Sequence, residues 1–525
     1  MNIREVIEQA AAKGKNATYL FFEDQETSFE EFHSKVNQVA NGLASSGLNR
    51  GEKVCLMLPN CPEFLYSWFG ANKLGAVMVP VNTAFKTEEV KYIVTHSEAK
   101  VMITHPSFLE MIKAIRKDCN DLETLVCLGE NLDSNVIPFS DLLHNSPILP
   151  PLKIDDEEIA AYVYTSGTTG FPKGVMLPHR SFVNTGEAFG LWFRLTPQDR
   201  IINHNPLFHA NAQCYATMGS LVAGIPLILV EKFSVSKFWD EARRYGATIA
   251  TAFGTPLLMK QPKSARDTGH SIRMFFFNQP VEFRERFNVR VNGGFSMTES
   301  MSGCLLAVSD LEQARGVRLD DIRCIGTGAP HPDPKKDTEI KVVDDNDNEA
   351  PVGEVGELLI RGPAVMKGYF KQPEETAKAL RGGWLHTGDA AFLGEDGLYY
   401  FVGRRKDLIR VMGENVSPAE IETVLNSHPK IQESACIPVP SPLRGEEIKA
   451  YVVLRPGETL APEEVVDWCR ERIAYFKVPR YVEYRPGLPK TAATLRVQKH
   501  LLKAEKADLT AGCYDRGERP SWYHS

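Results

Sequence analysis

Residues 164–174 read Tyr-Thr-Ser-Gly-Thr-Thr-Gly-Phe-Pro-Lys-Gly, and short apolar runs, 159–163 and 175–177, flank them on both sides. Apolar runs of this length are typical of buried strands, so the stretch is expected to form a loop between two strands. The loop is rich in groups that bind anions: N–H groups at Gly167, Gly170 and Gly174, and hydroxyls on Thr165, Ser166, Thr168 and Thr169. Lys173 adds a cation. The stretch therefore predicts a polyphosphate site.

Two alternatives compete with a polyphosphate site. The loop is not a Walker loop, because Lys173 precedes Gly174 rather than a serine or threonine. A glycine-serine turn that binds nothing is the other alternative, but ordinary hairpins rarely carry so many donors. The polyphosphate interpretation is preferred for that reason.

The composition is that of a globular protein with more than one domain. A chain of 525 residues is too long for one hydrophobic core. Its net charge of −7 gives no general attraction to nucleic acid or to an acidic membrane, so neither partner is expected. The ten cysteines lack the spacing of a metal site or a disulfide framework, which favours a reducing, cytoplasmic location.

The chain shows no targeting or membrane segment. Residues 1–15 contain Glu5 and Glu8 and lack an apolar core, so no signal peptide is predicted. The longest apolar run, near 219–230, is broken by Gly224 and Pro226. It predicts a buried strand rather than an integral membrane segment.

Helical and apolar segments alternate along most of the chain. Helices are expected within 2–46, with strands at 17–22 and 54–58. Residues 71–81 and 101–104 continue the alternation of helical and apolar segments. Residues 120–155 are turn-rich, 247–253 predict an interior strand, and 339–343 and 356–361 predict a small β unit. This pattern predicts an α/β fold with mostly parallel strands, in which layered α/β subdomains and the small β unit form a large N-terminal domain over 1–403.

A small, mobile α+β domain is predicted over 404–525. Strands are expected at 398–402, 408–411, 433–439, 449–454 and 481–484, with a helix at 461–475. Ser417-Pro418-Ala419-Glu420 predicts a capping box with proline at the first helical position. The tail from about Gly512 has no pattern and is expected to fray.

Three single residues are candidates for function, and each has a simpler explanation. His209, in Asn205-Pro-Leu-Phe-His209, could instead satisfy its hydrogen bonds in a core. Glu299, after a turn opened by Gly293 and Gly294, could hold a Mg²⁺ that bridges phosphates, or could face solvent. Asp389 ends a tight turn at 384–389, where it could accept hydrogen bonds from ligand hydroxyls or close an Asx-turn.

Several motifs together resemble those of the adenylate-forming enzymes, the superfamily of acyl-CoA synthetases, non-ribosomal adenylation domains and firefly luciferase. The resemblance covers about 29–499 and rests on the 164–174 loop and on the pairing of Leu385-His-Thr-Gly-Asp389 with Gly403-Arg-Arg-Lys-Asp407. Arg444-Gly-Glu-Glu and Ala474-Tyr-Phe-Lys are most similar to acyl-CoA synthetases of the crotonobetaine/carnitine-CoA ligase and medium-chain fatty-acid types. No carrier-protein or condensation module flanks the chain, which disfavours a non-ribosomal assembly line.

The resemblance implies an acid–CoA ligase that uses ATP, Mg²⁺ and coenzyme A and passes through an acyl-adenylate. It implies β- and γ-phosphate contacts from Thr165, Ser166, Gly167, Thr168, Thr169, Gly170 and Lys173, and an adenine site at Asn278, Gln279, Pro280 and Phe295. It also implies an α-phosphate contact from Thr298, a Mg²⁺ ligand in Glu299, and ribose contacts from Asp389 and Arg404. His209 would lie between the acyl pocket and the CoA tunnel, Lys406 at the interdomain hinge and Gly413 at the thioester-forming face. Homodimers are common among such relatives.

The sequence departs from the family pattern in three places. Phe295-Ser-Met-Thr-Glu299 replaces the usual Tyr-Gly-x-Thr-Glu, and the segment between Pro280 and Phe295 is shorter than usual. Near the C-terminus, Pro489-Lys-Thr-Ala-Ala-Thr-Leu-Arg496 lacks the glycine that precedes the catalytic lysine of the family. One alignment puts Leu495 in place of that lysine, and the preferred one puts Arg496 there; Lys499 could also substitute. Arginine keeps the charge but has a different shape.

Two rival functions stay open beside the ligase. One is an acyl-adenylate former that passes its product to a carrier protein. The other is a nucleotide-binding homologue with impaired adenylation, which the change to Arg496 suggests. The sequence does not identify the carboxylic acid; its pocket is expected near 204–213, 253–256 and 276–280, with His204, Phe208, Asn211 and Phe253 among the candidates.

Overall fold

The structure is a computed structural model that describes residues 1–517 except for 131, 166–171, 252–254, 277–280, 302–303, 308–322, 329–330, 412–413, 442–444, 474 and 492–496. The chain divides into two compact units. The first holds Met1–Lys341 and Leu359–His386, and the second holds Val342–Leu358 and Thr387–Ser525. Each unit is described by itself.

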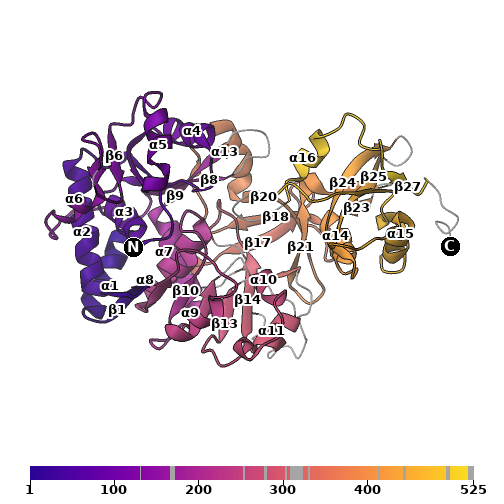
Figure 1. Cartoon of the computed structure of the whole chain (residues 1–525), viewed down its shortest axis with the longest axis horizontal. Helices are drawn as coiled ribbons and strands as arrows, with labels where there is room; N and C mark the ends of the chain where they lie inside the picture. The colour runs from indigo at the N-terminus through magenta and orange to yellow at the C-terminus, as the bar shows by residue number, and fades with distance from the viewer. Residues whose placement is uncertain are drawn as a thin grey trace. The chain divides into compact units, whose positions relative to one another are not determined.

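One mixed sheet of the first unit carries the predicted phosphate loop (Figure 1). Its strand order is β19-β9-β8-β4-β3-β5-β6-β7, and Figure 1 labels β6, β8 and β9. The strands are β3 Lys53–Met57, β4 Val77–Pro80, β5 Ala99–Thr104, β6 Thr124–Cys127, β7 Ile137–Pro138, β8 Ile159–Thr165, β9 Lys173–Pro178 and β19 Gly368–Tyr369. The associated helices are α3 Pro62–Lys73, α4 Thr87–Ser97, α5 Pro106–Arg116, α6 Phe139–Leu143 and α13 Pro373–Ala379. The pairs from β8 to β7 are parallel, and β9 is antiparallel to both neighbours.

A second sheet of the first unit has the order β15-β14-β13-β12-β10-β11-β1-β2. Its strands are β1 Thr18–Phe22, β2 Gln25–Ser28, β10 Ile201–Asn203, β11 Leu227–Leu229, β12 Ile249–Thr251, β13 Met274–Phe276, β14 Arg290–Phe295 and β15 Cys304–Ala307. The helices are α1 Ile3–Gly14, α2 Phe29–Ser45, α7 His179–Trp192, α8 Met218–Ala223 after a π-helix at Ala212–Thr217, α9 Phe238–Arg244, α10 Thr255–Met259 and α11 Val281–Phe287. Only the outermost strand on each side is antiparallel. The predicted α/β class with mostly parallel strands is confirmed.

Local sequence signals explain how the N-terminal helices begin and pack. Ser28 and Glu31 form a reciprocal capping box at the start of α2. Trp68, Phe64 and Phe69 of α3 are 0% exposed and pack in the core that also holds α1 and α2. Burying each of these aromatic side chains contributes roughly 1.5–3 kcal/mol.

The second unit contains a sheet of the order β23-β22-β25-β26-β27, with β24 paired to β25. Its strands are β22 Ile409–Val411, β23 Glu414–Val416, β24 Ile431–Ser441, β25 Gly445–Leu454, β26 Tyr481–Tyr484 and β27 Tyr514–Asp515. Its helices are α14 Pro418–Asn426, α15 Pro462–Arg470 and α16 Lys499–Ala504.

The small β unit consists of β16 Cys324–Gly326, β17 Glu339–Val343, β18 Gly356–Arg361, β20 Leu385–Leu393 and β21 Tyr399–Arg404. The domain boundary at 403/404 and the hinge at Lys406 stay predictions.

The N-terminal half differs from its sequence-based prediction at two places. The apolar run near 219–230 is not one strand: α8 ends at Ala223, the following Gly224 has a φ of +67° that suits glycine, and β11 begins at Leu227. Residues 120–155 hold β6, β7 and α6 rather than turns alone. These elements are too short for a periodic pattern to reveal them.

The C-terminal half differs at four places. Residues 385–393 form strand β20 rather than a turn, with Gly388 at a φ of +69° inside it. The Ser417 hydroxyl makes no cap and donates instead to the Val402 carbonyl. Helix α15 ends at Arg470, and the N–H groups of Arg472 and Ile473 beyond it both donate to the Cys469 carbonyl. The tail forms β27 on β26, and Arg480 pairs with Asp515 at 2.9 Å.

Among the helices in the described part of the chain, none combines the length and apolar character needed to cross a bilayer.

A buried histidine gives the first unit a pH-dependent stability. His179 is 0% exposed at the start of α7, and the Ile3 N–H donates to its Nδ1 at 3.4 Å. Burial lowers the pKa of His179 to about 4. As the pH falls, the His179 imidazole is therefore protonated at a higher pH in the unfolded chain than in the folded one. Its contribution to the free energy of unfolding is fully present above about pH 6.5 and decreases toward pH 4.

We predict that His179→Gln makes the free energy of unfolding less dependent on pH. Between pH 6.5 and 4.5 the slope should fall by about 1.4 kcal/mol per pH unit, the value for one proton. Denaturant unfolding across this range measures it, with the exposed His144→Gln as the control. An unchanged slope in His179→Gln would contradict the prediction.

Candidate active site

The ends of the predicted phosphate loop face each other across two paired strands. Thr165, the last residue of β8, lies opposite Lys173, the first residue of β9, and Tyr164 lies opposite Gly174. The Tyr164 hydroxyl is 2.8 Å from His96 Nδ1, which anchors the strand end from α4. The strand–loop–strand prediction is thus confirmed by the flanking strands. The predicted contacts Ser166, Gly167, Thr168, Thr169 and Gly170 lie outside the described residues.

Lys173 lies against two residues that the sequence analysis did not select. Its Nζ is 2.5 Å from Glu375 Oε2 of α13 and 4.8 Å from the centre of the Tyr369 ring of β19. The side chain of Lys173 is only 19% exposed. A cation on an aromatic face beside a carboxylate is held by both contacts.

Tyr369 also contacts the candidate metal ligand. Its hydroxyl donates to Glu299 Oε1 at 2.9 Å, and the Met366 N–H donates to the Glu299 carbonyl at 2.8 Å. Glu299 is 8% exposed, while Thr298 and Phe295 are half-buried. Gly293 and Gly294 belong to strand β14 and do not open the turn as predicted, because β14 continues to Phe295. Tyr369 thus contacts Lys173 through its ring and Glu299 through its hydroxyl.

One described carboxylate fits a Mg²⁺ that is held mainly by phosphate. Among the residues that the structure describes, no three His, Cys, Asp or Glu side chains gather into a ready-made metal site. Magnesium commonly uses one or two protein carboxylates and takes its other ligands from phosphate and water. Glu299, buried and oriented by Tyr369, meets that requirement.

A buried amide network holds the segment that carries His209. The Asn203 side chain donates to the Asn205 carbonyl at 2.9 Å and accepts from Thr251 Oγ1 at 3.0 Å. The Asn205 side chain donates to Asn211 Oδ1 at 2.8 Å. Burial lowers the pKa of His209 to about 4, so its imidazole is neutral near pH 7.

Asn60 ties the same segment to two other parts of the first unit. Its Oδ1 accepts from the Leu207 N–H at 2.7 Å, and its Nδ2 donates to the Asn205 and Val230 carbonyls at 3.0 and 2.9 Å. Gln213 adds a bond from Nε2 to the Leu207 carbonyl at 2.8 Å. A single side chain with three bonds, 5% exposed, therefore sets the backbone just before His209.

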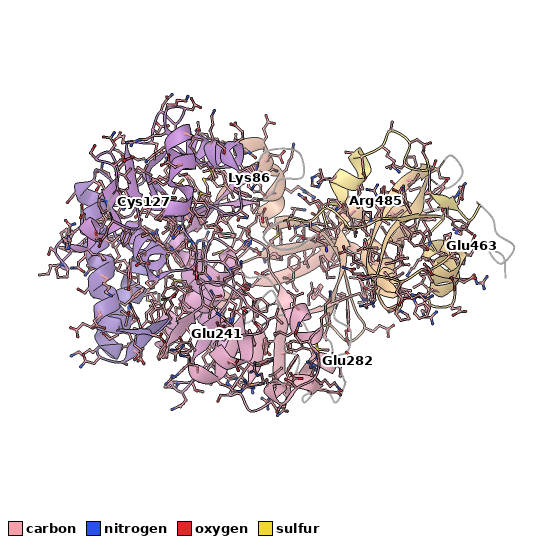
Figure 2. The ribbon with its side chains drawn as sticks, viewed as in Figure 1. Lys86, Cys127, Glu241, Glu282, Glu463 and Arg485 are labelled. Carbon is pink, nitrogen blue, oxygen red and sulfur yellow. The ribbon has the colours of Figure 1, made fainter. Side chains whose placement is uncertain are left out.

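His204 has a structural role that the sequence did not reveal. Its side chain is 0% exposed, and its Nε2 lies 3.1 Å from Glu241 Oε2 of α9, which Figure 2 labels. The Phe238 ring is 4.8 Å from its own ring. Burial lowers the pKa of His204, and Glu241 opposes that effect. These contacts place His204 in the core against α9.

The second unit holds the predicted ribose-binding pair. Asp389 lies opposite Arg404 in the β20–β21 register, and Arg404 Nε is 3.0 Å from Asp389 Oδ1. Arg404 also donates to the Thr387 carbonyl at 3.1 Å, and the Thr387 hydroxyl accepts from the Asp389 N–H at 3.0 Å. Asp389 is 1% exposed. An oriented carboxylate of this kind can accept hydrogen bonds from two neighbouring hydroxyls.

Several predicted residues lie outside the described residues: Asn278, Gln279, Pro280, Phe253, Gly413, Leu495 and Arg496. Lys499, the alternative to Arg496, is described. Its Nζ is 2.6 Å from Glu422 Oε1 within the second unit, and the Cys436 N–H donates to the same oxygen at 2.7 Å. Burial raises the pKa of Glu422, and Lys499 opposes this shift. Lys499 is thus engaged in an internal ion pair.

Known proteins match the chain over nearly its full length. The family model described as AMP-binding enzyme matches residues 7–370, and the one described as AMP-binding enzyme C-terminal domain matches residues 420–494. The chain belongs to this family of AMP-binding, adenylate-forming enzymes. Within the superfamily it is an AMP-forming acid–CoA ligase.

Individual relatives agree with this assignment. A crotonobetaine/carnitine–CoA ligase of Citrobacter koseri is 36% identical over 95% of this chain and 98% of its own. The enzyme of that name from Escherichia coli O139:H28 is 37% identical over 90% of this chain and 92% of its own. The anthranilate CoA ligase AuaEII in complex with anthranoyl-AMP has a TM-score of 0.84 and 28% identity, covering 96% and 97% of the two chains. ATP-bound MatB from Rhodopseudomonas palustris has a TM-score of 0.84 and 27% identity, covering 96% and 99%.

We predict that Asn60→Ala slows transfer of the acyl group to CoA by about tenfold, since the segment before His209 loses two anchoring bonds and its link to Val230. Single-turnover reaction of preformed acyl-adenylate with CoA measures this step, and pyrophosphate exchange measures adenylation. Asn72→Ala is the matched control, because Asn72 is equally buried and its side chain bonds the Ala76 and Ala160 carbonyls. If the two variants slow both steps alike, Asn60 acts only on stability.

Proposed function

We propose that this acid–CoA ligase activates a small carboxylic acid with ATP and Mg²⁺ and transfers it to CoA at a site built around Lys173, Tyr369 and Glu299. The observation that carries the proposal is the Tyr369 side chain, whose ring lies against Lys173 and whose hydroxyl binds Glu299. These two contacts support the proposal, because one side chain would hold both the cation for the terminal phosphates and the carboxylate for the metal. Bound Mg²⁺ would neutralise charge on the phosphates.

The reaction proceeds in two displacements. A carboxylate oxygen of the acid attacks the α-phosphorus of ATP, the bond to the bridging oxygen breaks, and pyrophosphate leaves with the electron pair. The CoA sulfur then attacks the acyl carbon of the acyl-adenylate, the thiol proton passes to solvent, and AMP leaves. The first step is needed because a free carboxylate would have to expel oxide, whereas AMP is a competent leaving group.

Each remaining role is proposed from the family pattern. Thr165 and Lys173, with Ser166, Gly167, Thr168, Thr169 and Gly170, would hold the β- and γ-phosphates. Asn278, Gln279, Pro280 and Phe295 would border adenine, Thr298 the α-phosphate, Glu299 the Mg²⁺, and Asp389 and Arg404 the ribose. His209 and Gly413 would serve the CoA step. The neutral imidazole of His209 supports its place there, because it adds no charge beside an uncharged thioester.

We propose that Arg496 contacts the reacting carboxylate and α-phosphate during adenylation. The ion pair of Lys499 with Glu422 supports this choice, because freeing that ammonium would leave a largely buried carboxylate unpaired. Arg496→Ala should therefore lower the rate of adenylation about a hundredfold, and Arg496→Lys by less than about tenfold. Pyrophosphate exchange measures both. An increase of tenfold or more in Arg496→Lys would instead support an impaired homologue.

The acid is proposed to be small and to carry a quaternary ammonium group, because the curated relatives at 36–37% identity are crotonobetaine/carnitine–CoA ligases. A cytoplasmic location is proposed because the described cysteines are free thiols and the reaction consumes ATP and CoA. The homodimer suggested by the family resemblance would be tested by the mass in solution.

We predict that pyrophosphate release depends on a trimethylammonium acid. The assay compares 4-(trimethylammonio)but-2-enoate with 5,5-dimethylhex-2-enoate, its uncharged isostere, each with and without CoA. A cation-binding pocket should favour the charged acid by about tenfold or more in kcat/KM. Equal rates would contradict the proposed acid and leave the ligase intact. Transfer to a carrier protein but not to CoA would contradict the ligase itself.

A further inference from the structure

Glu375 forms an ion pair with Lys173 from outside the predicted phosphate loop. Its Oε2 lies 2.5 Å from Lys173 Nζ, and its Oε1 lies 3.0 Å from Lys378 Nζ, one turn along α13. The Glu375 side chain is 41% exposed, whereas that of Lys173 is 19% exposed. Both lysines lower the pKa of Glu375, so it is ionised near pH 7. The charge of Lys173 is therefore balanced before any phosphate arrives.

The backbone fixes the position of this pair. Strand β19 pairs with β9, so that Tyr369 lies opposite Val175, and the Phe370 N–H donates to the Gly174 carbonyl at 2.8 Å. Helix α13 begins three residues after Phe370, and its Thr376 hydroxyl accepts from the Tyr369 N–H at 2.9 Å. The segment 368–370 thus links the strand that carries Lys173 to the helix that carries Glu375.

The contacts leave Lys173 able to bind a phosphate without leaving Glu375. An ammonium group has three protons to donate, and one reaches Glu375. The carboxylate would then lie within one side-chain length of the bound phosphate oxygens and would repel them. Its charge opposes the binding of every anion that Lys173 contacts, whether ATP or the departing pyrophosphate.

We propose that Glu375 is an affinity-setting residue that weakens the hold of Lys173 on pyrophosphate and so allows this product to leave. The proposal rests on the proposed contact between Lys173 and the terminal phosphates of ATP. While pyrophosphate stays bound, it can attack the acyl-adenylate and re-form ATP, so its departure commits the acyl-adenylate to thioester formation. A site with an unbalanced lysine would bind substrate and product more tightly alike, which does not speed the chemical step.

The test is product inhibition by pyrophosphate in the purified full-length chain. Glu375→Gln keeps the size and an oxygen acceptor but removes the charge. It should lower the inhibition constant of pyrophosphate, and the KM for ATP, by about threefold to tenfold. Glu374→Gln is the matched control, because Glu374 is an exposed carboxylate on the same helix, and it should change neither constant. Raising the salt concentration should reduce the difference between Glu375→Gln and the unaltered chain.

The outcomes distinguish this proposal from the proposed contact between Lys173 and the terminal phosphates, on which it rests. Lys173→Met should raise the inhibition constant of pyrophosphate, and Glu375→Gln should have little effect when added to Lys173→Met. If Lys173→Met leaves the constant unchanged, Lys173 does not contact pyrophosphate and both proposals fail. The remaining outcome is that Lys173→Met raises the inhibition constant of pyrophosphate while Glu375→Gln raises that constant or leaves it unchanged. In that case Glu375 only orders the lysine, and the proposal for Glu375 alone is overturned.

Discussion

The pairing of β9 with β8 on one side and β19 on the other fixes where the residues proposed to bind phosphate lie. The β8–β9 register sets Thr165 opposite Lys173 at the ends of the loop. The β19 pairing brings Tyr369 from about 200 residues away against Lys173, and its hydroxyl then reaches Glu299. Three segments distant in sequence are thus held by backbone hydrogen bonds, which vary little with the identity of the side chains.

Electrostatic balance is the second constraint on this site. ATP brings several negative charges to a chain whose net charge is −7, so the attraction has to be local. Lys173 is proposed to supply this attraction. Glu375 pairs with its ammonium group, and the face of the Tyr369 ring, which carries no formal charge, contacts the same group. The same reasoning applies to Asp389, a buried carboxylate that Arg404 contacts at 3.0 Å. Charges in both units are held in pairs.

The sequence predicts the phosphate loop because its chemistry is local, with glycines, hydroxyls and a lysine in one stretch. It also predicts the α/β class, since helical and apolar segments alternate. It does not predict Tyr369 or Glu375, because a two-residue strand has no periodic pattern and their partners are far away in sequence. The sequence around Gly388 predicts a turn where the structure has a strand, since a glycine with positive φ can also lie within a distorted strand. The three bonds of Asn60 depend on segments that only the folded chain brings together.

The most direct test of the account follows the carboxylate oxygen of the acid. The enzyme is given ATP, CoA and its acid substrate labelled with ¹⁸O in the carboxylate, and the nucleotide product is analysed by mass spectrometry. Attack of the carboxylate on the α-phosphorus predicts AMP that carries one labelled oxygen, together with unlabelled pyrophosphate. Formation of ADP with the label in inorganic phosphate, or of AMP without label, would contradict an acyl-adenylate intermediate.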